Sequence, residues 1–220
     1  MAPQVIWRFA PLGEGALLVH AQGPPADLAN RYALALSRAV DALSIPGIQS
    51  ALPGIGSVLV AFDPLSATRG VVERRIESLA ADLQPAPESP ERVADIPVVF
   101  GGEEGPDLED AGRELGLSPE DIIAALTVRP YRVMMIGFAY GFPYIGPLPS
   151  CLDLPRHSTP RVRVPAGSVA IAAGMAGIYP VEVPGGWRLV GRTSLRLFDP
   201  ARQGQPALLS AGDGVRFVAA

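Results

Sequence analysis

Residues 133–152 decide the fold class: they read VMMIGFAYGFPYIGPLPSCL and carry no charged side chain. The run is about as long as the ~20 apolar residues that a membrane-spanning helix needs. Three glycines and three prolines interrupt it, and in lipid they would leave the backbone of a helix without hydrogen-bond partners. The segment therefore predicts short packed strands joined by tight loops, and it does not predict a membrane span.

The same pattern extends to both sides of this segment. From residue 131 onward, short apolar stretches are cut by glycine and proline at close intervals, which is typical of an all-β barrel or sandwich. Residues 164–181 are again uncharged, and both uncharged stretches are expected to form either core or a partly apolar cleft. With 48% hydrophobic residues, 24 glycines and 24 prolines in 220, the chain has ample material for a core and many turns.

The first part of the chain has a different pattern. Short strands are expected at residues 4–10 and 15–21, followed by an amphipathic helix at 27–43 with apolar residues at helical spacing. A further strand is expected at 56–62 and a second helix at 69–83. The order β-β-α-β-β-α, in which one strand after the first helix has no assigned range, predicts a compact α+β layer.

A proline-rich segment separates the two patterns. Residues 84–92 read QPAPESPER, with three prolines, several charges and almost nothing to bury. We place the domain boundary here, which gives an N-terminal domain of residues 1–84, a linker of residues 85–92 and a C-terminal domain of residues 93–220.

Two short helices are expected early in the second domain. The first covers residues 106–115 and ends at Gly116, and the second begins with Ser118 as N-cap and Pro119 in its first turn. The pair resembles a helix-turn-helix, but its acidic residues outnumber its one basic residue, Arg113, so it predicts a packed hairpin and not a DNA reader. The acidic residues are Asp107, Glu109, Asp110, Glu114, Glu120 and Asp121.

Composition and missing motifs exclude several self-contained activities. All 18 basic residues are arginine, which removes a phosphate-loop or Schiff-base lysine, and the net charge of −4 argues against nucleic-acid binding. Two histidines, His20 and His157, and one cysteine, Cys151, are too few for a zinc site without several carboxylates, so no metal site is expected. The single cysteine fits a reducing compartment, and residues 1–19 do not read as a signal peptide, so a cytoplasmic location is expected.

Arginines crowd the segment PRHSTPRVRVPAGSVAI at residues 155–171. Guanidinium groups suit carboxylates and phosphates, and Arg161 and Arg163 would share one face of an extended strand. Together with Arg156 they form either a site for a carboxylate ligand or partner, or a solvated rim paired with local acids. The residue pattern leaves both readings open.

The segment GIYPVEVPGGWRLVGRT at residues 177–193 places Tyr179 and Trp187 between glycines and prolines. Tyrosine and tryptophan are common anchors at binding surfaces and also common core residues. The sequence does not choose between these roles.

At these segments the chain resembles the family that contains the B subunit of 5-oxoprolinase, allophanate hydrolase subunit 1 and the sporulation kinase inhibitor KipI. The likeness is ordered along nearly the whole chain and weaker in the first 90 residues. It is carried by IPVVFGGEEGPDL at 96–108, GFAYGFPYIGPLP at 137–149, residues 155–171, residues 177–193, the closing LFDP and GDGVRF, and SVLVAFDP at 57–64.

The resemblance implies an N-terminal ferredoxin-like α+β domain followed by a C-terminal cyclophilin-like β-barrel, without prolyl isomerase activity. It also implies two partners: a cyclophilin-fold chain like the C subunit of 5-oxoprolinase, here called the C-type partner, and a chain like its A subunit, the A-type partner. Together they would open the 5-oxoproline lactam using ATP, while this chain alone would bind no cofactor and have no activity. The residues expected to line its share of the substrate site, with no nucleophile among them, are Tyr144, Arg156, Arg161, Arg163, Ser168, Tyr179 and Arg192.

Tyr140 stands where the family has proline, and at four further positions an apolar residue replaces a polar one. Leu126 stands where a histidine is expected, Met175 and Ala176 replace Gln and Thr, and Val183 replaces Ser or Thr. The loss of these polar groups favours an alternative function, a KipI-like regulator that inhibits a sensor histidine kinase. If the four mark one altered site, they should lie near one another in the fold.

Overall fold

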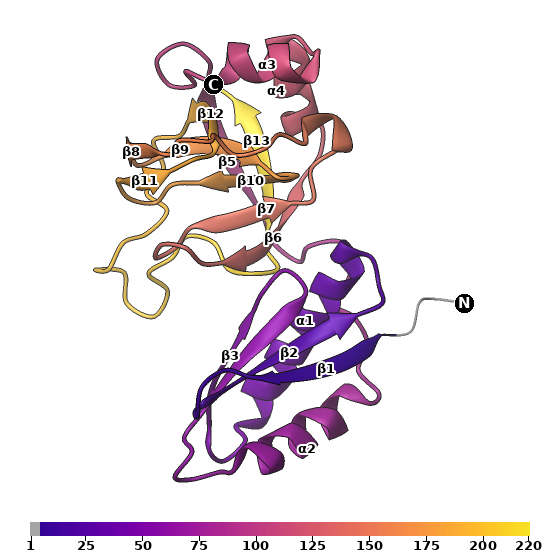
Figure 1. The fold of residues 1–220 in the computed structure, drawn as a ribbon. Coiled ribbons are helices and arrows are strands. Elements are labelled where there is room, and N and C mark those ends of the chain that lie inside the picture. The colour runs from indigo at the N-terminus through magenta and orange to yellow at the C-terminus, as the bar shows by residue number, and fades with distance from the viewer. Residues whose placement is uncertain (1–4) are drawn as a thin grey trace. The chain divides into compact units, whose positions relative to one another are not determined.

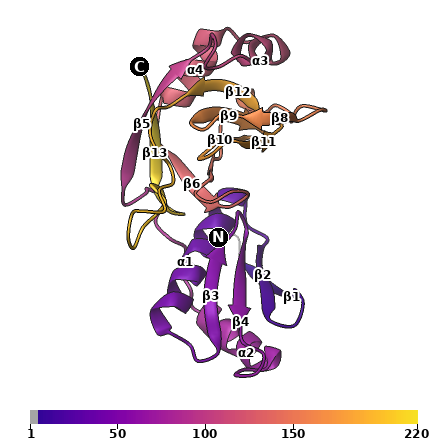
Figure 2. The same cartoon turned by 90° about the vertical axis from the view of Figure 1, so that its left-hand side faces the viewer.

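The computed structural model describes residues 5–220, and within them the chain forms two compact units that are divided between Ser89 and Pro90. Residue 4, where the first strand was expected to begin, lies outside the described residues. Each unit has its own hydrophobic core. Figures 1 and 2 show the course of the chain within each unit.

The first unit is a four-stranded antiparallel sheet with the order β1-β2-β4-β3. Read from β2, its elements follow the β-α-β-β-α-β order of the ferredoxin-like motif, except that β1 takes the place of the last strand beside β2. The unit is therefore a ferredoxin-like layer whose last strand comes first in the chain. Its elements are β1 (Ile6–Pro11), β2 (Ala16–Gln22), α1 (Ala26–Leu43), β3 (Ile48–Pro53), β4 (Ser57–Phe62) and α2 (Arg69–Ala80).

Both helices of this unit pack on the same face of its sheet. Residues of β2 alternate between buried and half-buried, and Leu17 and Val19 lie in one cluster with Leu36 of α1 and Ile76 of α2. This is the period of two that a strand with one covered face requires.

Hydrogen bonds to the backbone hold both ends of the segment predicted as a linker. The N–H of Ala86 donates to the carbonyl of Arg31 at 3.0 Å, and the Arg31 Nε–H donates back to Ala86 at 2.6 Å. At the other end, the N–H of Gly214 donates to the carbonyl of Arg92 at 2.7 Å. Ala86 is thus fixed to the first unit and Arg92 to the second.

The second unit is a closed seven-stranded barrel with the order β10-β7-β6-β13-β5-β12-β9, so the predicted fold class is confirmed. Its strands pair antiparallel except β13, which pairs with β5 in parallel over its length. Two further strands, β8 (Arg161–Val164) and β11 (Val183–Gly185), form a small separate sheet. The barrel strands are β5 (Val93–Phe100), β6 (Tyr131–Ile136), β7 (Pro143–Gly146), β9 (Ser168–Ala172), β10 (Met175–Ile178), β12 (Arg188–Arg192) and β13 (Gly214–Ala219).

Two helices, α3 (Leu108–Leu115) and α4 (Pro119–Thr127), lie together beside one end of the barrel. The predicted capping of α4 is confirmed, because the Ser118 side chain accepts from the Asp121 N–H and the Asp121 carboxylate accepts from the Ser118 N–H. Buried residues of α4 join the barrel core, as expected for a packed hairpin. Helix α3 begins two residues later than predicted.

Uncharged residues 133–152 occur in β6, β7, their connections and a short 3₁₀ turn, Ser150–Leu152, instead of one long helix. Among residues 5–220, no helix is long and apolar enough to cross a membrane.

Candidate functional site

An aromatic pocket of about 220 Å³ opens in the barrel unit beside β7 and β11. Five of its lining residues carry aromatic rings, one carries a positive charge, and the others are glycines and prolines that shape the wall. The lining residues are Phe138, Phe142, Tyr144, Arg156, Pro160, Tyr179, Pro184, Gly185, Gly186 and Trp187. We call this cavity the aromatic pocket.

Phe142 lies at the centre of its ring cluster. Its ring centroid is 5.1 Å from those of Tyr144 and Tyr179 and 5.7 Å from that of Trp187, all in edge-to-face geometry. This arrangement places positive ring edges against negative ring faces and stabilises each pair. Gly177 of β10 is required behind it, because a Cβ at that position would overlap the Phe142 ring.

Tyr179 supplies a buried hydroxyl to the wall of the aromatic pocket. Tyr179 is 1% exposed, and burial raises the pKa of its phenol. A hydrogen bond from the Trp187 backbone lowers this pKa, but burial is the larger effect. The phenol therefore stays neutral at physiological pH and keeps a proton to donate. Gly185 passes so close to the hydroxyl that a side chain there would displace it.

Arg156 brings a positive charge to the aromatic pocket. Its guanidinium carbon is 5.9 Å from the Trp187 ring centroid, within the range of a cation–π contact. The residue is exposed, and no carboxylate among residues 5–220 pairs with it. A guanidinium that lies against a ring and has no acidic partner is well placed to take the carboxylate of a ligand.

Asp107 anchors a buried polar network close to this pocket. Its carboxylate is 6% exposed and accepts two hydrogen bonds from Arg161, at 2.6 and 2.9 Å, and one from the Leu189 N–H at 2.7 Å. The His157 Nε2 lies 3.3 Å away. The network ties the start of α3 to β8 and β12.

The contacts of Asp107 determine its charge. Burial raises the pKa of the carboxyl group, but the hydrogen bonds from Arg161, Leu189 and His157 and the charge of Arg161 outweigh burial and lower the pKa overall. Asp107 is thus a carboxylate at neutral pH. Two nitrogens of the Arg161 guanidinium donate to the two oxygens of this carboxylate. The first role of Arg161 is therefore to hold the fold.

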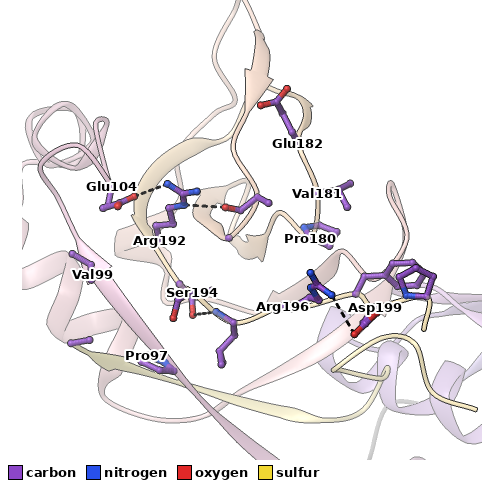
Figure 3. Close-up of a pocket in the computed structure, with 17 residues that line it drawn as sticks. Pro97, Val99, Glu104, Pro180, Val181, Glu182, Arg192, Ser194, Arg196 and Asp199 are labelled. Atoms are coloured by element: carbon purple, nitrogen blue, oxygen red, sulfur yellow. Dashed lines mark hydrogen bonds and ion pairs between the residues drawn. The ribbon is translucent and has the colours of Figure 1, made fainter. Parts of the chain in front are cut away.

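A larger groove of about 900 Å³ lies between β5, the end of β12 and the chain that follows it (Figure 3). Arg192 extends across it, donating to Glu104 at 3.2 Å and to the carbonyl of Ala166 at 3.0 Å. Arg196 pairs with Asp199 at 3.4 Å on the other side. We call this surface the β5–β12 groove. Both of its arginines, Arg192 and Arg196, are paired with carboxylates of the same groove, whereas Arg156 of the aromatic pocket has no such partner among residues 5–220.

A family model described as carboxyltransferase domain, subdomain C and D, matches residues 7–209. The chain belongs to this carboxyltransferase family. The 5-oxoprolinase B subunit of Escherichia coli O157:H7 is 41% identical over 210 residues, which cover 94% of this chain and 93% of that protein. The resemblance to the family of the 5-oxoprolinase B subunit is thereby confirmed.

Solved structures share the fold, among them the following two. The crystal structure of TTHA0988 is 38% identical with a TM-score of 0.79, and the match covers 94% of this chain but 40% of that chain. The urea carboxylase of Kluyveromyces lactis has a TM-score of 0.77 at 20% identity, covering 99% of this chain and 22% of that protein. The present chain thus spans less than half the length of these two structures, and the second likeness shows the fold alone.

Four of the seven residues predicted for the site lie in or beside the aromatic pocket of this carboxyltransferase-family chain. Tyr144, Arg156 and Tyr179 line it. Arg161 follows the lining residue Pro160 in the chain and is bound to Asp107. These four come from separate elements of the barrel unit and its loops, brought together by the fold.

The other three predicted residues lie elsewhere. Arg192 crosses the β5–β12 groove. Arg163 lines neither cavity, since its side chain is 80% exposed and pairs with Glu182 at 3.8 Å. Ser168 is 2% exposed within β9 and is absent from both linings. The seven residues therefore do not form one wall.

Sequence reasoning did not assign Phe138, Phe142 or Asp107 to the site. The two phenylalanines belong to the uncharged run of residues 133–152, for which the sequence left core and a partly apolar cleft as alternatives. Asp107 reads as one of several acids of the helix pair. One usable signal for the phenylalanines was the density of aromatic residues between glycines at 137–144.

The structure does not gather the four apolar replacements, so the expectation of one altered site is wrong. Leu126 and Ala176 are fully buried in the barrel core, whereas Met175 and Val183 pack at the edge of the aromatic cluster. Met175 and Ala176 are adjacent in β10 and therefore point to opposite faces. None of the four lines the aromatic pocket or the β5–β12 groove.

Within residues 5–220, no three His, Cys, Asp or Glu side chains group as a metal ion would require.

Proposed function

We propose that this chain is a subunit of a cytoplasmic ATP-dependent 5-oxoprolinase complex and contributes part of the substrate site through its aromatic pocket. One observation carries the proposal: Arg156, which has no acidic partner among residues 5–220, lies against an apolar, aromatic cavity of about 220 Å³. A cavity of this kind suits a compact ring that bears one carboxylate.

5-Oxoproline has an apolar ring and one carboxylate, which match the aromatic residues and the arginine of the pocket. Its ring methylenes would lie against the faces of Phe142 and Trp187, and its carboxylate would receive the Arg156 guanidinium. The hydroxyls of Tyr144 and Tyr179, which line the same pocket, would donate to the carbonyl of the ring amide. We assign these residues to binding and orientation and none to nucleophilic attack.

The pocket alone does not supply the rest of the reaction. Activation by ATP needs groups that hold phosphates, and the sequence contains no lysine and no phosphate loop. We therefore assign ATP to the complex, which this chain would form with the A-type and C-type partners. That the 41% identical relative is named as a subunit supports an assembly of this kind.

We place the C-type partner on the β5–β12 groove. This surface combines exposed apolar residues with arginine and acidic side chains, which is the mixture found at protein interfaces. Val181 is 41% exposed and the Arg196 side chain 72% exposed, so their replacement should leave the barrel folded. Val181→Asp and Arg196→Glu are expected to weaken association with the C-type partner by about tenfold each.

Co-expression followed by size-exclusion chromatography and titration of the purified chains measures this association. Val128→Asp is the matched control, because Val128 is 73% exposed at the end of α4 and outside the groove. Co-elution of wild type and control, with weaker association of the two groove variants, supports the assignment. If the folded chain never co-elutes with the partner, the subunit model fails; if all variants associate equally, the partner binds another face.

The alternative function, a KipI-like regulator that inhibits a sensor histidine kinase, was favoured by the loss of polar groups at Leu126, Met175, Ala176 and Val183. These four positions divide between two clusters and line neither cavity, so they add no second site to the described part of the chain. The aromatic pocket, whose Arg156 has no acidic partner among residues 5–220, supports the enzyme-subunit function, which we therefore propose ahead of the alternative.

A further inference from the structure

Phe138 has a strained backbone at the mouth of the aromatic pocket. Its φ is +65°, in the left-handed region that favours glycine, and the Ala139 N–H donates to the Gly137 carbonyl at 2.7 Å. A three-residue turn with positive φ at its centre is the rare form of the γ-turn, and it is unfavourable for a residue with a bulky side chain. Such strain persists only where the surroundings hold it, and it clusters at ligand clamps.

The turn directs a large apolar ring over the pocket without burying it. Phe138 is 62% exposed, and its ring meets Phe142 and Tyr179 edge to face at centroid distances of 5.4 and 6.4 Å. It is also one of the residues that line the cavity. A strained residue that leaves most of its ring in water gains little from the folded chain alone, but it would bury that ring on an occupant of the pocket.

We propose that Phe138 is a specificity-determining residue, whose ring covers one face of a cyclic ligand while Arg156 holds the ligand's carboxylate. The ligand class rests on the proposed function. Phe138 favours a flat or puckered ring over an open chain of similar charge, because only the ring presents a continuous apolar face to it.

The strain is tested first, on the full chain and without ligand. Phe138→Gly and Phe138→Ala both remove the ring, but alanine keeps a Cβ in the left-handed region and glycine does not. Phe138→Gly is therefore expected to melt at a higher temperature than Phe138→Ala. Tyr140 is the matched control: it lies in the same loop, is 81% exposed, stacks on Phe198 outside the pocket, and is not among the residues with positive φ. There, the glycine variant should melt no higher than the alanine variant.

The contact with a ligand is tested by calorimetry, using the full chain alone and with its C-type partner. The probes are 5-oxoproline and cyclopentanecarboxylate as ring carboxylates and glutarate as an open-chain acid. Phe138→Ala is expected to bind both ring carboxylates about threefold to tenfold more weakly, with glutarate little changed. Tyr140→Ala should bind all three like the wild type.

The outcomes separate the two proposals. If the wild type binds ring carboxylates and Phe138→Ala binds them equally well, the assignment of Phe138 is wrong and the proposed function stands. If the wild type binds no ring carboxylate, either alone or with its C-type partner, the proposed function fails and the assignment of Phe138 fails with it. Equal melting temperatures of Phe138→Gly and Phe138→Ala would refute the strained clamp independently of any ligand.

Discussion

Replacing Asp107 by asparagine is expected to lower the free energy of unfolding of the barrel unit by about 2 to 4 kcal/mol. The substitution leaves Arg161 facing a neutral amide and replaces the charged acceptor of the Leu189 N–H. Breaking a fully buried ion pair costs about 3 to 5 kcal/mol, and the estimate is lower here because the Arg161 side chain is 34% exposed. Chemical denaturation of wild type and variant at pH 7 measures the difference.

The stability difference between wild type and Asp107→Asn should depend on pH in a direction that the pKa of Asp107 fixes. The folded pKa of Asp107 lies below its usual value of 3.8, so its contribution is fully present above that value and is lost as the pH falls through the folded pKa. The gap between wild type and Asp107→Asn should be present at neutral pH and close as the pH falls below 3.8. Asp110→Asn is the control, since Asp110 is an exposed partner of Arg113 and should cost about 0.5 kcal/mol or less. A gap that widens in acid would contradict the assignment.

Replacing Arg156 by glutamine is expected to weaken binding of 5-oxoproline by about 10- to 100-fold. The change removes the charge that would meet the ligand's carboxylate and keeps a side chain over Trp187. Calorimetry on the chain with its C-type partner measures the loss, and stability should change little because Arg156 is exposed.

Arg163→Gln is the matched control for this prediction. Arg163 comes from the same arginine-rich segment, but it is 80% exposed, pairs with Glu182 and lines neither cavity. It should bind 5-oxoproline like the wild type. Equal losses for both variants would mean that the ligand responds to the charge of the whole segment and not to the aromatic pocket.

Local signals in the sequence predict much of the fold. The Ser118 capping box and Pro119 fix the start of α4, and Gly116 ends α3 with its left-handed backbone. Closure of the barrel depends on the parallel pairing of β13 with β5, from opposite ends of the unit. No local pattern encodes that contact. Strand β3 has no predicted range because its sequence, IQSALP, mixes polar residues and proline.

The sequence could predict which types of residue form the site, but not which individual residues. The arginine-rich segment and the Tyr- and Trp-bearing segment were each compatible with a binding role and with a structural one, and the fold brings Arg156 to Tyr179 and Trp187. Which arginine is available depends on Asp107, 54 residues before its partner Arg161, and on that carboxylate being buried. Burial and long-range pairing are properties of the folded chain, so sequence spacing could not separate Arg156 from Arg161.

The central claim, that this chain is an indispensable but not self-sufficient part of a 5-oxoprolinase, is tested most directly by 5-oxoproline-dependent ATP hydrolysis. The assay compares the purified chain, the A-type and C-type partners without it, and all three together. The account predicts turnover only in the complete mixture, with a large loss when the Arg156→Gln variant replaces the wild type. Turnover by the isolated chain, or undiminished turnover by the two partners without it, would contradict the account.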